Sequence, residues 1–279
     1  MNVFQQVGVT PRMTRAFPRP LSIALLLLGA STPVAARQST DALPPATSTN
    51  AIRLPSGAAA VPFRVGEKLE YDVKFGSLKV GSGSMEVHEL TEVRGVTTWH
   101  TVFRISGGIP FYRVNDRYES WFDVATLTTR RYHQDISQGS YEPKRHYEFF
   151  NERGMYQEND KPEQPTVAMP LDDGSFLYFV RTIPLDVGQS YTFSRYFKPD
   201  ANPVTINVLR RETITVRAGT FSTVVLQPMF KSKGIFSEDG KAEVWVTDDE
   251  RRMMVQMKSK LSIGSINLFL RAHNTTPPP

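Results

Sequence analysis

The sequence contains no cysteine among its 279 residues. Disulfides, thiol catalysis and a lipid-modified cysteine are therefore excluded. Histidine is scarce, and its five positions are His88, His100, His133, His146 and His273. No two of them have the His-x-His or His-x-x-x-His spacing that places two imidazoles beside one metal ion. We therefore predict neither a metal site nor a cofactor, and we expect these histidines on solvated strand faces.

Long apolar runs are also missing. The run from Leu21 to Ala30 is too short for a membrane-spanning helix, which needs about 20 residues. It is preceded by three arginines and no acid, and it is followed by small residues that end at Ala36. This order is typical of a secretory signal peptide. We predict that residues 1–36 are removed after Ala36 and that the mature protein is periplasmic and does not span a membrane. The pattern is complete from Met13 as well as from Met1, so both starts stay open.

A strong net charge is absent once the signal is removed. The chain has 33 basic and 28 acidic residues, and residues 1–36 hold three arginines and no acid, which leaves 30 against 28. A nearly neutral protein lacks the basic field that attracts nucleic acid. We therefore predict no nucleic-acid partner.

The remaining chain divides into three parts by composition. Residues 37–62 are rich in Ala, Pro, Ser and Thr without apolar periodicity, which predicts a disordered linker. Residues 63–272 have the length of one β domain. Residues 273–279 end in three prolines and are predicted to be a disordered tail.

Within 63–272, apolar and charged residues alternate. Charged residues separate Leu69, Tyr71, Val73 and Phe75, and a period of two gives a strand one buried face. We predict that all four side chains are buried. Gly76-Ser77 follows with the glycine first, as a type II′ hairpin requires, and Arg94-Gly95 is the next predicted turn.

Further strands are predicted near 117–124, 128–137, 140–150, 189–197, 204–216, 221–231, 241–247, 252–263 and 265–271. Pro143 and Pro228 should lie at edges or bulges. An Asp cap followed by helical spacing of apolar residues predicts a short helix over 173–182. A turn after Val216 should require a positive φ at Gly219.

The two halves of this region are similar. Val65-Gly66-Glu67 corresponds to Val187-Gly188-Gln189, and a Glu-x-Trp segment occurs at 119–121 and again at 243–245. We predict an all-β protein, a curved antiparallel sheet that forms an open barrel or sandwich-like single domain from two similar halves, with one short helix near 173–182.

Several motifs together resemble one bacterial family. They are Phe-x-Val-Gly-Glu-x-Leu-x-Tyr at 63–71, the glycine-rich strand at 78–87, the segment 173–185 around Tyr178 and Arg181, Val-x-Ala-Gly-Thr-Phe at 216–221, and the strand around Trp245. On these motifs the chain is similar to the "domain of unknown function 3108" family. The resemblance implies an exported protein with a curved antiparallel sheet, and it implies no catalytic residues.

The sequence evidence for catalytic residues is weak. Gly81-Ser82-Gly83-Ser84 lies in a strand and is not a Gly-x-Ser-x-Gly elbow. Asp172-Asp173 and Asp248-Asp249-Glu250 lack calcium-loop spacing and are interpreted as a helix cap and a hairpin turn. Glu119 and Glu243 are candidates for paired carboxylates, but each is expected to face away from the tryptophan that follows it. We therefore predict no catalytic residue and favour a protein without enzymatic activity.

Aromatic residues are plentiful, with 17 Phe, 10 Tyr and 3 Trp. A curved sheet that does not close leaves a concave apolar face, which suits an acyl chain or apolar peptide. Our leading hypothesis is a periplasmic binding or envelope-maintenance protein whose apolar groove takes lipid, lipoprotein or peptide. The predicted groove residues are Phe103, Phe176, Tyr178 and Met229. The alternatives are an envelope hydrolase with a site assembled from distant strands and a structural partner of an envelope complex.

Overall fold

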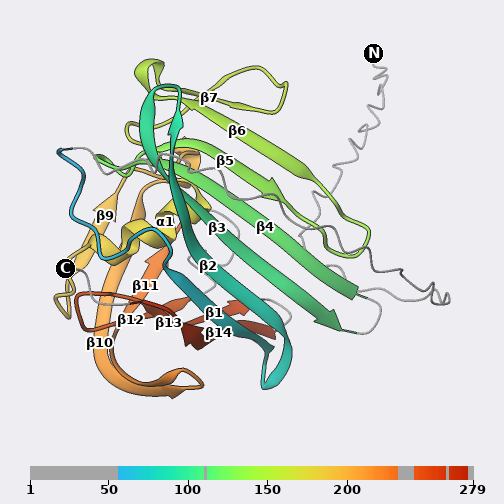
Figure 1. Cartoon of the computed structure of the whole chain (residues 1–279), viewed down its shortest axis with the longest axis vertical. Coiled ribbons are helices and arrows are strands. Elements are labelled where there is room, and N and C mark those ends of the chain that lie inside the picture. Colours follow the sequence, from blue (N-terminus) through green and yellow to red (C-terminus); the bar gives the residue numbers. More distant parts are fainter. Residues whose placement is uncertain (1–55, 110–111, 232–241, 262–263, 276–279) are drawn as a thin grey trace, which may run out of the picture.

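The structure, a computed structural model, describes residues 56–109, 112–231, 242–261 and 264–275. The predicted signal peptide, its cleavage site after Ala36 and most of the predicted linker lie outside these residues. Figure 1 shows a strongly curved sheet with one short helix against its inner side.

The described residues form one antiparallel sheet of 14 strands. Its order is β8-β7-β6-β5-β4-β3-β2-β1-β14-β13-β12-β11-β10-β9, so the C-terminal strand pairs with the first. The strands are β1 (Lys68–Phe75), β2 (Leu78–Val93), β3 (Val96–Ile109), β4 (Tyr112–Asp123), β5 (Thr129–Asp135), β6 (Lys144–Phe150), β7 (Met155–Glu158), β8 (Gln164–Pro165), β9 (Ser190–Phe193), β10 (Val204–Val216), β11 (Gly219–Met229), β12 (Glu243–Thr247), β13 (Met254–Leu261) and β14 (Gly264–His273). The helices are α1 (Asp173–Phe179) and the 3-10 turns η1 (Asn151–Arg153), η2 (Val180–Thr182) and η3 (Pro199–Ala201). The predicted all-β class with one short helix is confirmed.

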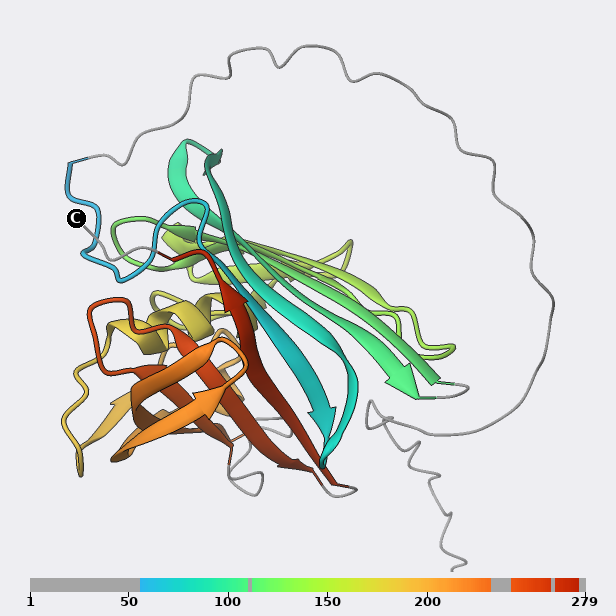
Figure 2. The ribbon, with the colours of Figure 1, turned by 60° about the horizontal axis from the view of Figure 1, so that its bottom comes forward.

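The sheet stays open because β8 and β9 form its two edges. At the end near α1 the edges come close, since a parallel bridge joins Leu171 to Tyr196. Thr166 also donates to the carbonyl of Phe197 at 2.8 Å. Away from α1 no such link occurs among the described residues, and Figure 2 shows β2–β6 extending well past the helix. The molecule is therefore a barrel-like sheet that is nearly joined at one end and open at the other.

Alternation in β1 places Leu69, Tyr71 and Val73 in the core, as predicted. Phe75 is different, because 41% of its surface is exposed. The pairing of β1 with β14 continues without a shift from Val73 to Phe75, so Phe75 still points to the inner face. The prediction that it is buried is wrong, because α1 contacts β3 and β4 and does not extend over the β1–β2 hairpin.

The predicted hairpin turns are confirmed. Gly76 has φ 58° and connects the paired residues Phe75 and Leu78. Arg94 and Gly95 have φ 50° and 77°, which is the left-handed pair of a type I′ turn. Gly219 has φ 140° at the start of β11.

The two halves share their turns and bulges. Gly66 donates to Val87 and Gly188 donates to Val208, each at 2.8 Å, before the first strand of each half. The register shifts directly after Trp121 in β4 and directly after Trp245 in β12. The common local geometry supports the predicted similarity of β1–β5 and β9–β13.

Residues at both ends of the predicted β domain contact its core. Ala59 donates to the carbonyl of Val124 at 2.8 Å, and Ala58 and Val61 pack on the core. At the other end, Asn274 accepts from the Lys68 amide at 2.7 Å.

The observed strands also differ from the predicted strands elsewhere. β7 and β8 were not predicted because they are short and their sequences do not alternate. Pro165 lies in the edge strand β8, where a missing N–H is tolerated. Pro228 lies beyond the part of β11 that pairs with β12, as expected of an unpaired edge.

Candidate functional site

A row of half-buried apolar side chains lies on the inner face beyond α1. Level with the helix, Trp99 and Phe122 are fully buried. Further along the same strands, Phe103 on β3 lies opposite Tyr118 on β4 with ring centroids 6.0 Å apart, and Ile105 follows on the same face. These three side chains, which we call the apolar strip, are partly buried and pack against the edge of the core.

The strip continues toward the β1–β2 hairpin. Exposed Phe75 and Leu78 lie opposite one another at its end. Between them and Ile105, β2 and β3 carry glycines, with Gly83 opposite Ile105 and Gly81 opposite Gly107. The two backbones approach closely there, since a Cβ at Gly81 would lie 2.3 Å from the carbonyl oxygen of Ser106.

Polar groups border the apolar strip on one side. Asp116 is paired with Ile105 and is buried, and it accepts hydrogen bonds from Gln138 at 2.6 Å and from the Ser137 amide at 3.1 Å. Burial raises the pKa of Asp116. Burial also raises the pKa of Tyr118, and the negative charge of nearby Asp116 raises it further. Both shifts follow from the burial of these two groups.

Gln134 and Arg145 extend this polar border across β5 and β6. Arg145 donates to Tyr141 at 2.7 Å and to Gln134 at 3.4 Å. Beside the apolar strip, the inner face is therefore polar at Gln134 on β5 and Arg145 on β6, although Tyr132 and Tyr147 of the same strands lie in the core. A surface with two such halves suits an amphiphile better than a purely apolar ligand.

The position of α1 sets where the apolar strip begins. Asp172 caps the helix by accepting from the amides of Gly174 and Ser175 at 2.7 and 3.0 Å. It also accepts from Ser120 at 2.5 Å and from Thr129 at 2.7 Å. Burial raises the pKa of Asp172 to about 6, although its hydrogen bonds act in the opposite direction. The predicted Asp cap is thus confirmed, and it ties the helix to β4 and β5.

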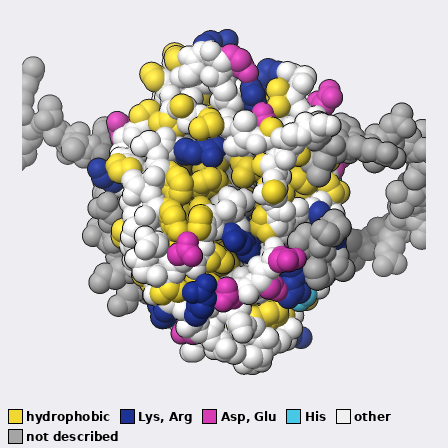
Figure 3. Space-filling model, turned by 90° about the vertical axis from the view of Figure 1, so that its left-hand side faces the viewer, with side chains coloured by type: hydrophobic (Ala, Val, Ile, Leu, Met, Phe, Trp, Pro, Cys, Tyr) yellow, Lys and Arg dark blue, Asp and Glu magenta, His cyan; other side chains and the backbone are white. Residues whose placement is uncertain are grey.

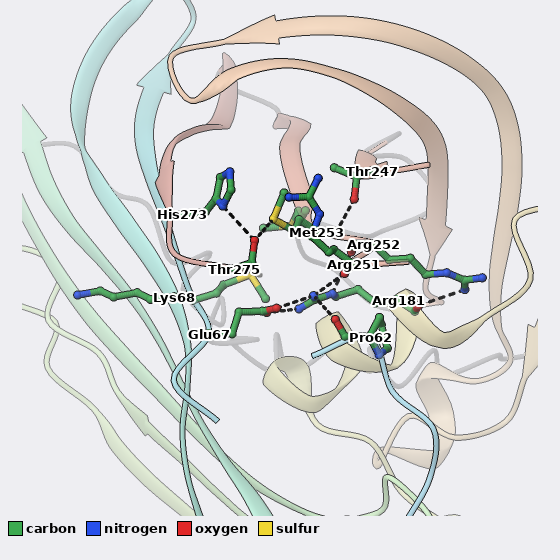
Figure 4. A network of polar contacts seen from close by, with 12 residues as sticks. Pro62, Glu67, Lys68, Arg181, Thr247, Arg251, Arg252, Met253, His273 and Thr275 are labelled. Carbon is green, nitrogen blue, oxygen red and sulfur yellow. Dashed lines mark hydrogen bonds and ion pairs between the residues drawn. The ribbon is translucent and has the colours of Figure 1, made fainter. Parts of the chain in front are cut away.

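A buried arginine anchors the other end of the helix, as Figure 4 shows. Arg181 in η2 is 1% exposed and binds both carboxylate oxygens of Glu67 at 2.5 and 3.0 Å. Its remaining N–H groups donate to the carbonyls of Arg252 at 2.9 Å, Arg251 at 2.8 Å and Pro62 at 3.2 Å. One guanidinium therefore connects the helix, the segment before β1 and the turn between β12 and β13.

The four predicted groove residues do not lie together. Phe103 lies in the apolar strip. Phe176 and Tyr178 are 2% and 3% exposed in the core, where Phe176 packs on Phe230 and Tyr178 on Phe63. Sequence reasoning placed these two in the groove because it could not tell the helix face that packs on the sheet from a ligand-binding face.

Met229 belongs to another surface. It pairs with Thr205, and its sulfur lies 4.0 Å from the side-chain amide of Asn207. Its neighbour Pro228 pairs with the core residue Ile206, so alternation directs Met229 to the outer face. The groove prediction missed Ile105, Tyr118, Phe75 and Leu78 of the open end. For Ile105 and Phe75, their place in the alternating pattern was the available signal.

The expected orientation of Glu119 is wrong. Glu119 and Trp121 are two residues apart on β4, so they share the outer face. His100 touches both of them, since its Nε2 lies 3.0 Å from Glu119 and its ring stacks on Trp121 at 4.3 Å. His100 is also buried rather than solvated.

The histidines offer no support for a serine hydrolase. Among the described residues, their hydrogen-bond and ion-pair partners are carboxylates and the hydroxyl of Thr275. Gly81-Ser82-Gly83-Ser84 lies inside β2, as predicted, and Ser82 faces Ser106 at 3.3 Å. Asp249 in the β12–β13 turn accepts from Thr247 and from the Arg251 amide, which confirms the predicted hairpin turn.

A second apolar area lies on another side of the molecule. Figure 3 shows hydrophobic side chains gathered in the middle of the face that looks left in Figure 1, with charged side chains around them. The segments that precede β1 and β9 both run along this side in Figure 1 and carry the exposed Val65 and Val187.

None of the helices in the described ranges has the length and apolar character of a membrane span. Fold and site together define an open, barrel-like antiparallel β protein with an uncovered inner face. Residues 70–271 match the family model described as "Protein of unknown function (DUF3108)", and the chain belongs to this family.

One solved structure supports the barrel-like fold. The chain is similar to a β-barrel-like protein of domain of unknown function DUF1849 from Brucella abortus, with 11% identity and a TM-score of 0.50 over 78% of this chain and 100% of that chain. A DUF1089 family protein from Pseudomonas aeruginosa gives 12% identity and a TM-score of 0.35 over 73% of this chain and 95% of that chain. A search of curated proteins found no match.

Proposed function

We propose that this protein is a non-enzymatic binding protein of the bacterial periplasm, which holds the acyl chain of a lipid or lipoprotein on the open inner face of its sheet. The observation that supports the proposal is the uncovered apolar strip of Phe103, Ile105 and Tyr118, which continues to the exposed Phe75. The predicted signal peptide supports the compartment.

Burial of an acyl chain provides the driving force. Each methylene removed from water contributes about 0.8 kcal/mol, so ten methylenes contribute roughly 8 kcal/mol before the costs of ordering the chain. Gln134 and Arg145 at its polar border are placed to contact a headgroup.

The test is displacement of a fluorescent fatty acid from the mature protein, residues 37–279. Wild type should show saturable binding, and Ile105→Asp should weaken it at least tenfold because a charge enters the apolar strip. Phe75→Asp should weaken it less, since Phe75 lies at the end of the strip. Val187→Asp is the matched control, because Val187 is about as exposed as Phe75 and lies before β9.

Circular dichroism and thermal melting establish that each variant is folded. Absence of saturable binding by folded wild type would refute the proposal. Equal weakening by Val187→Asp would refute the site. Native mass spectrometry of protein purified from the periplasm provides a second readout, because a bound lipid adds a discrete mass.

A second candidate function, a structural partner in an envelope complex, is favoured by the apolar area in Figure 3. The same variants separate the two functions. A partner-binding protein would lose its complex in Val187→Asp and keep it in Ile105→Asp, and it would show no fatty-acid binding.

A further inference from the structure

A β-bulge on the outer face brings two sequence neighbours beside one histidine. Val87 of β2 pairs with Thr101 of β3, and the next pair is Glu89 with His100, which leaves His88 as the extra residue. A bulge of this kind sets two consecutive side chains on the same side of the sheet. His88 and Glu89 therefore both face the outer side, opposite His100.

The ligand atoms of the three residues are close together. One ligand atom from each of His88, Glu89 and His100 lies within 4.8 Å of the others. His100 Nδ1 is 3.4 Å from Glu89 Oε1. Two ligands bound tetrahedrally at zinc distances are about 3.4 Å apart, so this pair needs no rearrangement. The His88 side chain is 52% exposed.

Each histidine has a carboxylate on its other nitrogen. His100 Nε2 lies 3.0 Å from Glu119, which in turn accepts from Arg117 at 2.6 Å. His88 Nδ1 lies 3.1 Å from Glu86, so its Nε2 is the nitrogen available for a ligand. Metal-binding histidines usually donate their second ring N–H to a carboxylate, which fixes the tautomer and the ring orientation. A merely solvated pair of histidines has no need of this arrangement.

Packing further fixes the central ligand. The His100 ring is stacked on Trp121 with centroids 4.3 Å apart and planes at 11°, and it contacts the His88 ring edge-on at 5.3 Å. His100 is 8% exposed. The buried imidazole therefore forms a rigid base, and the two exposed ligands close over it.

We propose that His88, Glu89 and His100 form a binding site for a divalent transition-metal ion on the outer face of the sheet. Two imidazole nitrogens and one carboxylate are a ligand set that zinc uses with its fourth position open, and copper also accepts it. The site lies on the face opposite the apolar strip, so it is independent of lipid binding. It departs from the prediction of no metal site, because that prediction considered histidine spacing along one element and not pairing across two strands.

The experiment uses metal-free mature protein, prepared with EDTA and dialysed, and titrates it with ZnCl₂ in a calorimeter. Wild type should bind one zinc ion per chain with a micromolar or lower dissociation constant. His88→Ala and Glu89→Gln should each weaken this binding at least tenfold, and both residues are exposed, so the variants should fold. His146→Ala is the matched control, because His146 stacks on His133 at 4.1 Å on the same face but has no place in the site.

Copper gives a separate optical readout. Cu²⁺ bound beside His100 should quench the fluorescence of Trp121, and His88→Ala should shift the quenching to at least tenfold higher copper concentration. The Trp121→Phe variant should lose this component of quenching. Zinc binding that fails to saturate near one equivalent, or that falls equally in His146→Ala and His88→Ala, would overturn the proposal.

Discussion

Arg181 and Glu67 form a two-pronged ion pair in the core, although 114 positions separate them in the sequence. Burial alone would lower the pKa of Arg181, but Glu67 more than offsets this and raises it, so the guanidinium stays charged. Both charges have lost their water, and each depends on the other.

Removing either Arg181 or Glu67 alone should therefore lower the stability of the fold. Arg181→Met leaves the Glu67 carboxylate buried without its cation and should reduce the free energy of unfolding by about 3–5 kcal/mol in a urea titration. Arg153→Met is the control, since its pair with Glu163 is exposed and such pairs contribute about 0–1 kcal/mol. A double variant with Glu67→Leu should lose less than the sum of the two single losses. Strict additivity would contradict the coupling.

Two apolar residues of β1 should behave differently when truncated. Leu69→Ala creates a cavity in the core and should cost about 2–5 kcal/mol. Phe75→Ala removes a ring that is 41% exposed and should cost about 1 kcal/mol or less. Denaturant unfolding of both variants measures the contrast. Equal losses would mean that Phe75 is covered in solution.

A backbone requirement can be tested at Gly219. Its φ of 140° is unfavourable for a residue with a Cβ, while the nearest atoms to an added Cβ, in the Phe221 ring, are at an ordinary 3.7 Å. Gly219→Ala should therefore destabilise the protein by about 1–3 kcal/mol through the backbone alone. A thermal melt compared with wild type detects this. An unchanged melting temperature would show that the turn adopts another conformation.

His133 provides a prediction about pH. Burial, then repulsion from His146 and Arg131, lowers its pKa from the ordinary 6.5 to about 4. Because the folded state disfavours the protonated ring, the stability associated with neutral His133 is present above pH 6.5 and is lost as the pH falls through 4. A titration of the histidine ring signals by NMR should give a midpoint near 4. His146→Gln should raise this midpoint and His88→Gln should leave it unchanged. A wild-type midpoint near 6.5 would contradict the assigned packing.

Much of the architecture could be predicted because its causes are local. Alternation in β1 directs side chains to one face whatever the rest of the chain does. Gly76 and Arg94-Gly95 supply the positive φ values that hairpins need, and Asp172 caps α1 through amides only two and three residues away. The shared face of Glu119 and Trp121 was also available from the period of two, and the expected opposite orientation was an error of interpretation.

The sequence by itself determined most of the strands, the turns Gly76-Ser77 and Arg94-Gly95 and the apolar face of β1, because neighbouring residues decide backbone conformation and alternation. The short strands β7 and β8 lack alternation and were recognised only from their pairing. Only the tertiary structure decided how far α1 covers the inner face, and hence why Tyr71 is core while Phe75 is exposed on the same strand. Strand pairing also decided that His88 and Glu89 lie beside His100. The bulge in β2 and the β2–β3 register that bring them together cannot be read from the spacing of residues along the sequence.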